Sequence, residues 1–226
     1  MQGYVLTGRH AVFASYEAFI EIISSMADQY EKFLRISKDF SWRGNIPSFN
    51  YILTSSGWRQ EHNGFSHQNP KFISGMLDKP SSLCKIYFPP DGNSSLVVLK
   101  KCLVSINGIN VIVAGKTLEP RWLSVDLALK ELRDGLMIWD FASDKNPDIV
   151  VCGIGDYLTK EALAGVDIIK SLLPNVKVRF VNIMILYYDF FNNINFIKFF
   201  TKNKPVIFNY HGYPSDLRAM LFNQGD

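Results

Sequence analysis

The residues best suited to chemistry lie in one short polar run, Arg59 to Pro70. The run contains His62 and His67, five residues apart, and it is dense in amide side chains. Imidazole titrates near neutral pH and can act as acid or base, while amides and arginine bind polar oxygens. A simple turn does not need so many polar groups directly after an apolar, strand-like segment. The pattern therefore indicates a pocket for a substrate or a cofactor.

Two other kinds of site fit this run poorly. The spacing of His62 and His67 does not put both rings on one helical face, and no acidic or cysteine partner stands at a useful interval for a metal. A Ser-His-Asp hydrolase is disfavoured because the Gly-x-Ser-x-Gly elbow does not occur. We therefore predict no metal ligand in this chain.

Three residues outside the run are further candidates. Lys116 directly follows the apolar segment Ile109 to Gly115. Ligands of open α/β sheets bind at the carboxyl ends of strands, so this lysine suits an anion, although a solvated lysine is the alternative. Tyr16 opens a predicted helix, where an aromatic is usually buried in the core. His211 closes the last predicted strand, and we expect it to cap that strand or pack in the core.

Composition narrows the class of protein. The chain has 226 residues, 47% hydrophobic and 20% charged, with a net charge of +3, which is typical of a soluble globular protein. Lysines and arginines are scattered, so nucleic acid is not an expected partner. The most apolar segment, residues 183–200, is too polar for a membrane span. Cys84, Cys102 and Cys152 are widely spaced, and we expect buried, reduced thiols in a cytoplasmic protein.

Apolar runs that alternate with helical patterns predict an α/β fold with parallel sheets. A polar linker near residue 143 separates two such blocks, so we predict two small units, residues 1–140 and 141–226. The predicted helices are residues 15–36, 94–102, 124–139 and 159–173, and a short one from 215. The predicted strands are residues 48–54, 85–88, 109–114, 148–152, 176–182 and 205–210.

The run W-R-Q-E-H-N-G-F-S-H-Q, from Trp58 to Gln68, closely resembles a signature of phosphoketolases. Other segments resemble the same family in order and spacing: Gly3–His10, Pro89–Asn93, Val111–Lys116 and Lys204–Phe208. Phosphoketolases are thiamine-diphosphate enzymes that cleave xylulose 5-phosphate or fructose 6-phosphate with inorganic phosphate, giving acetyl phosphate and an aldose phosphate. The resemblance implies a pyrimidine-binding domain over residues 1–140, lacking its start, and the first part of a transketolase-like carboxy-terminal domain over 141–226.

The resemblance also implies roles for individual residues. Tyr16 would pack near the aminopyrimidine ring of the cofactor. His62 and His67 would bind sugar hydroxyls and move protons during cleavage. The residues that would line the pocket for the substrate phosphate or inorganic phosphate are Gln60, His62, Asn63 and Lys116. The pairing of His62-Asn63 with Lys116 favours a phosphoketolase over a transketolase-like protein that uses no phosphate.

The chain also departs from the family pattern. Family members are several times longer, and the Gly-Asp-Gly motif that holds Mg²⁺ and the diphosphate does not occur here. The family's catalytic glutamate precedes the run that begins at Gly3, and neither Glu17 nor Glu61 is its counterpart. We therefore expect a partial chain that is inactive alone, from a family whose active sites form in a homodimer or larger oligomer. The alternative is a non-catalytic degenerate fragment, or a complementing subunit that binds a separately encoded amino-terminal domain.

Overall fold

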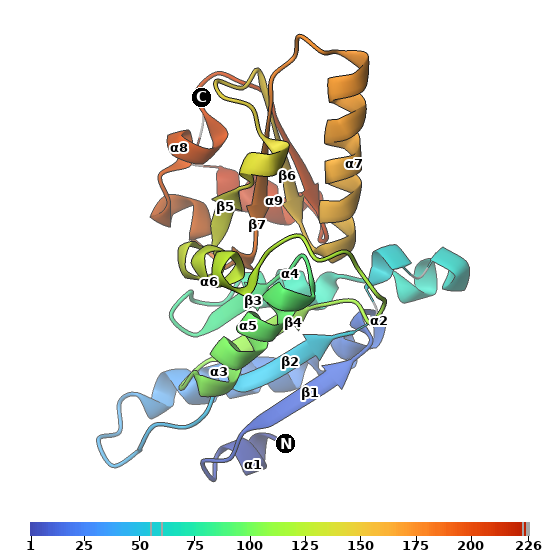
Figure 1. Cartoon of the computed structure of the whole chain (residues 1–226). Coiled ribbons are helices and arrows are strands. Elements are labelled where there is room, and N and C mark those ends of the chain that lie inside the picture. The colour runs from blue at the N-terminus through green and yellow to red at the C-terminus, as the bar shows by residue number, and fades with distance from the viewer. Residues whose placement is uncertain (55, 60, 223, 225–226) are drawn as a thin grey trace.

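The computed structural model describes residues 1–54, 56–59, 61–222 and 224, and it contains two sheets. The strands of the first sheet are, in spatial order, β1 (Ala11–Ser15), β2 (Phe49–Leu53), β4 (Ile109–Val113), β3 (Cys84–Tyr87) and β8 (Ile185–Leu186). All neighbours are parallel except β8, which runs antiparallel to β3. This sheet forms the lower half of the molecule in Figure 1.

The strands of the second sheet are β5 (Leu136–Ile138), β7 (Val178–Ile183), β6 (Ile149–Ile154) and β9 (Val206–Tyr210), in that order. Three of them are parallel, and β5 runs antiparallel to β7. The predicted α/β class with parallel sheets is therefore confirmed. The sheets exchange elements: β5 pairs in the second sheet, whereas β8, which follows β7 in the chain, returns to the first. The division at residue 140 stays a prediction.

Helices cover both faces of the sheets, and each face has its own apolar cluster. One cluster receives side chains from α3 (Ser24–Ser37), α4 (Lys71–Leu77), α8 (Phe196–Phe200) and α9 (Pro214–Leu221). The other receives them from α5 (Gly92–Val104), α6 (Val125–Asp134) and α7 (Asp156–Leu172). Successive strand residues alternate between clusters, as Val111 and Ile112 do, because side chains of a strand point to opposite faces. Both clusters draw on both sheets.

The predicted helix over residues 15–36 is wrong at its start. Residues Ala11–Ser15 form β1, which pairs in register with β2, and the helical region begins at α2 (Glu17–Ile20). A 3₁₀ turn at Glu21–Ile23 then separates α2 from α3. The helical spacing of apolar residues continues across the turn, so the periodicity could not reveal the break. Tyr16 is the residue before the helix.

The predicted helix over residues 124–139 ends early, at Asp134. Gly135 takes a left-handed conformation with φ of 85°, and its N–H donates to the Glu131 carbonyl at 2.7 Å. Glycine is the usual residue at such a helix end because it has no Cβ to clash. The three residues that follow form β5 and complete the edge of the second sheet.

The aromatic segment between β7 and β9 contains β8, a 3₁₀ turn at Phe190–Asn193 and α8. Phe190, Phe191 and Phe200 are buried, and the rings of Phe191 and Phe200 lie within about 6 Å of Phe208 in β9. The cysteines are free and buried, as predicted, and burial raises the pKa values of Cys84 and Cys102 to about 12. Across the described part of the chain, no helix is long and apolar enough to span a membrane.

The remaining helical segments are short. They are α1 (Gln2–Val5) and the 3₁₀ turns Gly57–Arg59, Glu61–Asn63, Phe65–His67 and Asp140–Ala142. Three of these turns follow β2 directly and make up most of the polar run singled out by the sequence. We refer to residues 57–68 as the polar loop.

Candidate functional site

The candidate site lies where neighbouring strands of the first sheet end. Tyr16 follows β1, the polar loop follows β2, and Lys116 follows β4 by three residues. Because these strands are parallel neighbours in the order β1-β2-β4, their carboxyl ends lie at one edge of the sheet. This is the edge at which open α/β sheets bind ligands. Gln60, a predicted phosphate ligand, lies outside the described residues.

Lys116, Tyr16 and His67 are connected through direct contacts. The Lys116 ammonium donates to the Tyr16 hydroxyl at 2.9 Å and also lies 4.3 Å from the centre of the Tyr16 ring. The Tyr16 ring stacks on Phe19, with 5.9 Å between centroids and 10° between planes. Phe19 in turn meets the His67 imidazole edge-on at 5.1 Å. The structure therefore brings three of the predicted site residues to one surface.

His62 and Asn63 form a second group at the exposed tip of the polar loop. The Asn63 amide nitrogen lies 3.2 Å from His62 Nε2, so its N–H donates to the ring. The Ser66 hydroxyl donates to the Asn63 carbonyl at 3.2 Å and lies 3.0 Å from His67 Nδ1. Ser66 thus links this group to His67. Both imidazoles lie where protons can exchange with a bound molecule or with water.

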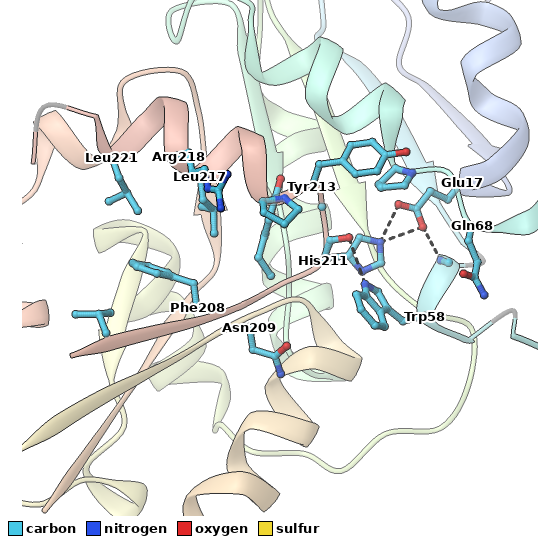
Figure 2. Close-up of a pocket in the computed structure, with 16 residues that line it drawn as sticks. Glu17, Trp58, Gln68, Phe208, Asn209, His211, Tyr213, Leu217, Arg218 and Leu221 are labelled. Carbon is cyan, nitrogen blue, oxygen red and sulfur yellow. Dashed lines mark hydrogen bonds and ion pairs between the residues drawn. The ribbon is translucent and has the colours of Figure 1, made fainter. Parts of the chain in front are cut away.

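A buried histidine–carboxylate pair lies beneath the polar loop. His211, directly after β9, places Nε2 2.8 and 3.0 Å from the two carboxylate oxygens of Glu17. The same carboxylate accepts the Gly57 N–H at 2.6 Å. The Trp58 indole N–H donates to the His211 carbonyl at 3.3 Å (Figure 2). Glu17 is 0% exposed and His211 2%, so both side chains are shielded from solvent.

Sequence reasoning did not find this pair. His211 was expected to cap the last strand or pack in the core, and it is buried at the end of β9, but its partner was not foreseen. Glu17 attracted attention only as a residue that does not correspond to the family's catalytic glutamate. The one available signal was a carboxylate within an apolar helix start, since Glu17 lies between Tyr16 and Ala18. A charged side chain at such a position is rarely buried without a partner.

A cavity of about 1040 Å³ adjoins the Glu17–His211 pair. One wall comes from Glu17 and the polar loop, and the other comes from β9 and α9. Figure 2 shows Trp58 and Gln68 on the side of the polar loop, with Phe208 and Leu217 on the opposite side. The cavity therefore lies between the polar loop on one side and β9 with α9 on the other, and the Glu17–His211 pair lies where the two sides meet.

A smaller cavity of about 380 Å³ lies beside the segment that carries Lys116. Asp156, the first residue of α7, accepts the Gly115 N–H at 2.9 Å there. Asp91 caps α5 by accepting the Ser94 N–H at 2.7 Å, and it also accepts the N–H groups of Trp122 and Leu123. The carboxylates of Asp91 and Asp156 therefore accept backbone N–H groups around the segment that follows β4.

The structural comparison defines the class of fold. A transketolase from Leishmania mexicana superposes with a TM-score of 0.62 at 17% identity, covering 87% of this chain and 26% of that one. A second structure is described as "Split gene transketolase, inactive beta4 tetramer". It gives a TM-score of 0.65 at 16% identity, over 99% of this chain and 66% of that one. The chain therefore has the α/β fold of transketolases.

Sequence comparison identifies the family. The family described as "D-xylulose 5-phosphate/D-fructose 6-phosphate phosphoketolase" matches residues 1–105, and the "XFP C-terminal domain" matches residues 116–226. Relatives from Nitrosospira multiformis and Nitrosomonas europaea, each named "Probable phosphoketolase", are 46% identical over 99% of this chain. The chain belongs to the phosphoketolase family, as its motifs predicted. It spans about 30% of the length of these relatives.

The residues of the site can be tested against the cofactor that the family implies. Tyr16 and Phe19 form a parallel aromatic pair, 39% and 46% exposed, beside a lysine. An exposed ring pair of this kind fits a flat heteroaromatic ring such as an aminopyrimidine. Among the residues that the structure describes, no group of three or more His, Cys, Asp or Glu could hold a metal ion. The absence of metal ligands from the whole chain stays a prediction.

Proposed function

We propose that this chain forms the sugar-phosphate-binding part of a thiamine-diphosphate-dependent phosphoketolase. The reaction we propose for the whole enzyme cleaves xylulose 5-phosphate or fructose 6-phosphate with inorganic phosphate, giving acetyl phosphate and an aldose phosphate. The observation that carries the proposal is the connected set of Lys116, Tyr16 and His67 at the carboxyl edge of the first sheet, in a chain of this family.

Lys116 is the proposed anchor for a phosphoryl group. Its ammonium is exposed yet oriented, since the Tyr16 hydroxyl and ring hold it from one side. A held cation loses less side-chain freedom when it binds an anion. Asn63 supplies an amide donor at the tip of the polar loop, and we assign the same role to Gln60. Together these donors would stabilise charge on phosphoryl oxygens as it develops.

His62 and His67 are the proposed proton carriers. Imidazole changes charge near neutral pH, and both rings lie on the polar loop that faces the lysine edge of the sheet. Contacts with Asn63 and Ser66 fix the orientation of each ring before substrate arrives. Orientation matters because a proton carrier must lie within hydrogen-bonding reach of the group it serves.

Tyr16 is the proposed contact for the cofactor's ring, with Phe19 stacked behind it. Thiamine diphosphate, when bound, supplies the electron sink for carbon–carbon cleavage. The role of this chain would be to position that ring against Lys116 and His67 and to exclude water from one side. We assign no ligand for Mg²⁺ to this chain. We propose that the whole enzyme acts in the cytoplasm as a homodimer or larger oligomer, without nucleic acid or a membrane as partner.

Acetyl phosphate formation tests the proposal. The purified chain would receive xylulose 5-phosphate, inorganic phosphate, thiamine diphosphate and Mg²⁺, alone and mixed with the amino-terminal domain of a longer relative. We expect product only in the mixture, and we expect Lys116→Met to abolish it. Lys101→Met, which changes an exposed lysine of α5, is the matched control and should leave the rate unchanged. No product in the mixture from a chain shown to be folded would overturn the proposal.

A complementing or purely binding role is the second candidate. In this role the chain would bind the amino-terminal domain without forming product itself. Sedimentation of the chain with the separate amino-terminal domain distinguishes the candidates. A stable complex without product would support the binding role, and a complex that forms product would support the enzyme.

A further inference from the structure

We propose that the second sheet's unit positions both segments of the candidate pocket through two buried carboxylate clamps. The first clamp is Glu17 with His211, which holds the polar loop at Gly57, and the second is Asp156, which holds Gly115 beside Lys116. The identification of the pocket rests on the proposed function, whereas the clamps themselves rest on geometry alone. Glu17, His211 and Asp156 are thus positioning residues that act through the loops they hold.

The first clamp fixes both ends of the polar loop. Glu17 accepts the Gly57 N–H at 2.6 Å, and a Cβ built on Gly57 would lie 3.2 Å from the Gln68 Cα. The first and last residues of the loop therefore pass against each other directly above the carboxylate. A charge removed from water must find hydrogen-bonding partners, so the Gly57 N–H and the His211 imidazole are both needed by Glu17.

The second sheet holds His211 rigidly. Its backbone N–H donates to the Ile154 carbonyl at 3.2 Å, which attaches it to the end of β6. A Cβ built on Gly155 would lie only 3.2 Å from the His211 Cβ, so the strand end packs closely against this side chain. The Trp58 indole N–H reaches the His211 carbonyl at 3.3 Å. The polar loop thus takes its position from the ends of β6 and β9.

In the second clamp, the carboxylate follows a strand of the second sheet, and the backbone that it holds follows a strand of the first sheet. Asp156 begins α7, and its Oδ1 accepts the Tyr157 N–H at 2.6 Å, which fixes the carboxylate on the helix. Its Oδ2 accepts the Gly115 N–H at 2.9 Å. Gly115 directly precedes Lys116, so the backbone of the proposed phosphate anchor depends on a side chain of the second unit. Asp156 is 7% exposed.

These two contacts determine how Lys116 and His67 lie relative to each other. Both loops belong to the first sheet by chain position, yet a carboxylate clamp joins each to a residue near the end of β6 or β9. A misplacement of about an ångström between reacting groups can cost on the order of a hundredfold in rate. Holding both loops against one rigid strand end would keep the pocket in its working geometry.

Hydrogen–deuterium exchange by mass spectrometry on the full chain tests the proposal segment by segment. We expect His211→Ala to speed exchange of residues 57–68 at least about tenfold, because it leaves a buried carboxylate short of a partner, and to leave residues 113–118 unchanged. Asp156→Ala should speed exchange of residues 113–118 and leave exchange of residues 57–68 unchanged. His211→Gln and Asp156→Asn keep a donor or acceptor in place and should restore most of the protection, which a role in packing alone would not predict.

Glu131→Gln is the matched control. Glu131 is also 0% exposed, but its partners are Trp139, directly after β5, and Asn182 in β7 of the second sheet. Glu131→Gln should leave the exchange rates of residues 57–68 and 113–118 unchanged. Should the His211→Ala chain fail to fold, Glu17→Ala gives the same test, because it removes the acceptor of the Gly57 N–H. Unchanged exchange in both segments, or equal acceleration of both by every clamp variant, would overturn the proposal. Neither result depends on catalytic activity.

Discussion

At the scale of single residues, one lysine illustrates how the site is prepared before any ligand arrives. Lys116 is exposed, and a free lysine there would sample many rotamers. Its contact with the Tyr16 hydroxyl and ring restricts it to the side of the edge where the polar loop lies. Tyr16 in turn rests on Phe19, which also touches His67. A substitution at Tyr16, Phe19 or His67 should therefore change the position of the Lys116 ammonium.

Phosphate binding separates the roles of Lys116 and Tyr16. We expect Lys116→Met to weaken binding of inorganic phosphate to the chain at least about tenfold, since charged hydrogen bonds contribute roughly 1.5–3 kcal/mol. Tyr16→Phe keeps the ring and removes only the hydroxyl, so its effect should be smaller, about two- to fivefold. Calorimetric titration with phosphate measures both. Equal binding by the Lys116→Met and Lys101→Met chains would contradict the assignment.

The structure brings Lys116, Tyr16 and His67 to one surface, and the sequence could single them out because a motif and a strand end are local features. Their roles in binding and catalysis stay predictions. The sequence could not pair Glu17 with His211, which lie 194 residues apart. Periodicity and spacing carry information about neighbours along one element, whereas this pair depends on how two sheets approach each other. The buried glutamate of α2 could have signalled a distant partner without naming it.

At the scale of elements, the errors in prediction have definite causes. The predicted helix began at Ser15, yet Ser15 is the last residue of β1, which pairs with β2 over five positions as an edge strand. Tertiary pairing outweighed local preference there. The end of α6 was missed because Gly135 was read as part of the helix. The parallel strands β2, β4 and β6 were found correctly, since strands covered on both faces read as continuous apolar runs.

Gly135 should be the glycine least tolerant of substitution at a helix end. Its φ of 85° disfavours a side chain, and an added Cβ would lie 2.9 Å from a ring carbon of Phe190. We expect Gly135→Ala to destabilise the fold by about 1–3 kcal/mol, and each kcal/mol lowers the melting temperature by roughly 2–4 °C. Thermal unfolding followed by circular dichroism measures this.

Gly165→Ala is the control for that substitution. Gly165 lies inside α7, and nothing stands within 4 Å of an added Cβ. Alanine there should stabilise the helix by about 0.5–1 kcal/mol, because glycine loses more freedom on folding. A Gly135→Ala chain that melts at or above the unsubstituted temperature would contradict the left-handed helix end.

At the scale of the whole molecule, the two sheets share their cores. Each apolar cluster takes side chains from both sheets, β8 crosses from the second unit to pair with β3, and the clamps join the loops to the far strand ends. Separating the units would expose both clusters at once. We therefore expect one unfolding transition in calorimetry, with equal calorimetric and van't Hoff enthalpies. Two resolved transitions would contradict the shared cores.

The stability of the whole chain should depend on pH through one buried carboxyl group. Burial raises the pKa of Glu131 from an ordinary value of 4.5 to about 8. Between these values the folded chain holds a proton that the unfolded chain has released, so stability falls as pH rises from about 5 to about 8. Above the pKa of Glu131 in the folded chain, stability no longer falls with pH. Below its pKa in the unfolded chain, Glu131 is protonated in both states and makes no pH-dependent contribution to stability.

Glu131→Gln isolates this dependence, because every other titrating group is present in both chains. Glutamine resembles the protonated acid, and Asn182 can turn its amide over to meet either hydrogen-bonding pattern while still contacting the Thr159 hydroxyl. We expect the melting temperature of Glu131→Gln, relative to that of the unsubstituted chain, to rise by about 3 °C or more between about pH 5 and about pH 8. A difference that stays constant over this range would mean that Glu131 is already ionised in the folded protein. The network of Glu131, Trp139 and Asn182 would then have to hold a charge that burial opposes.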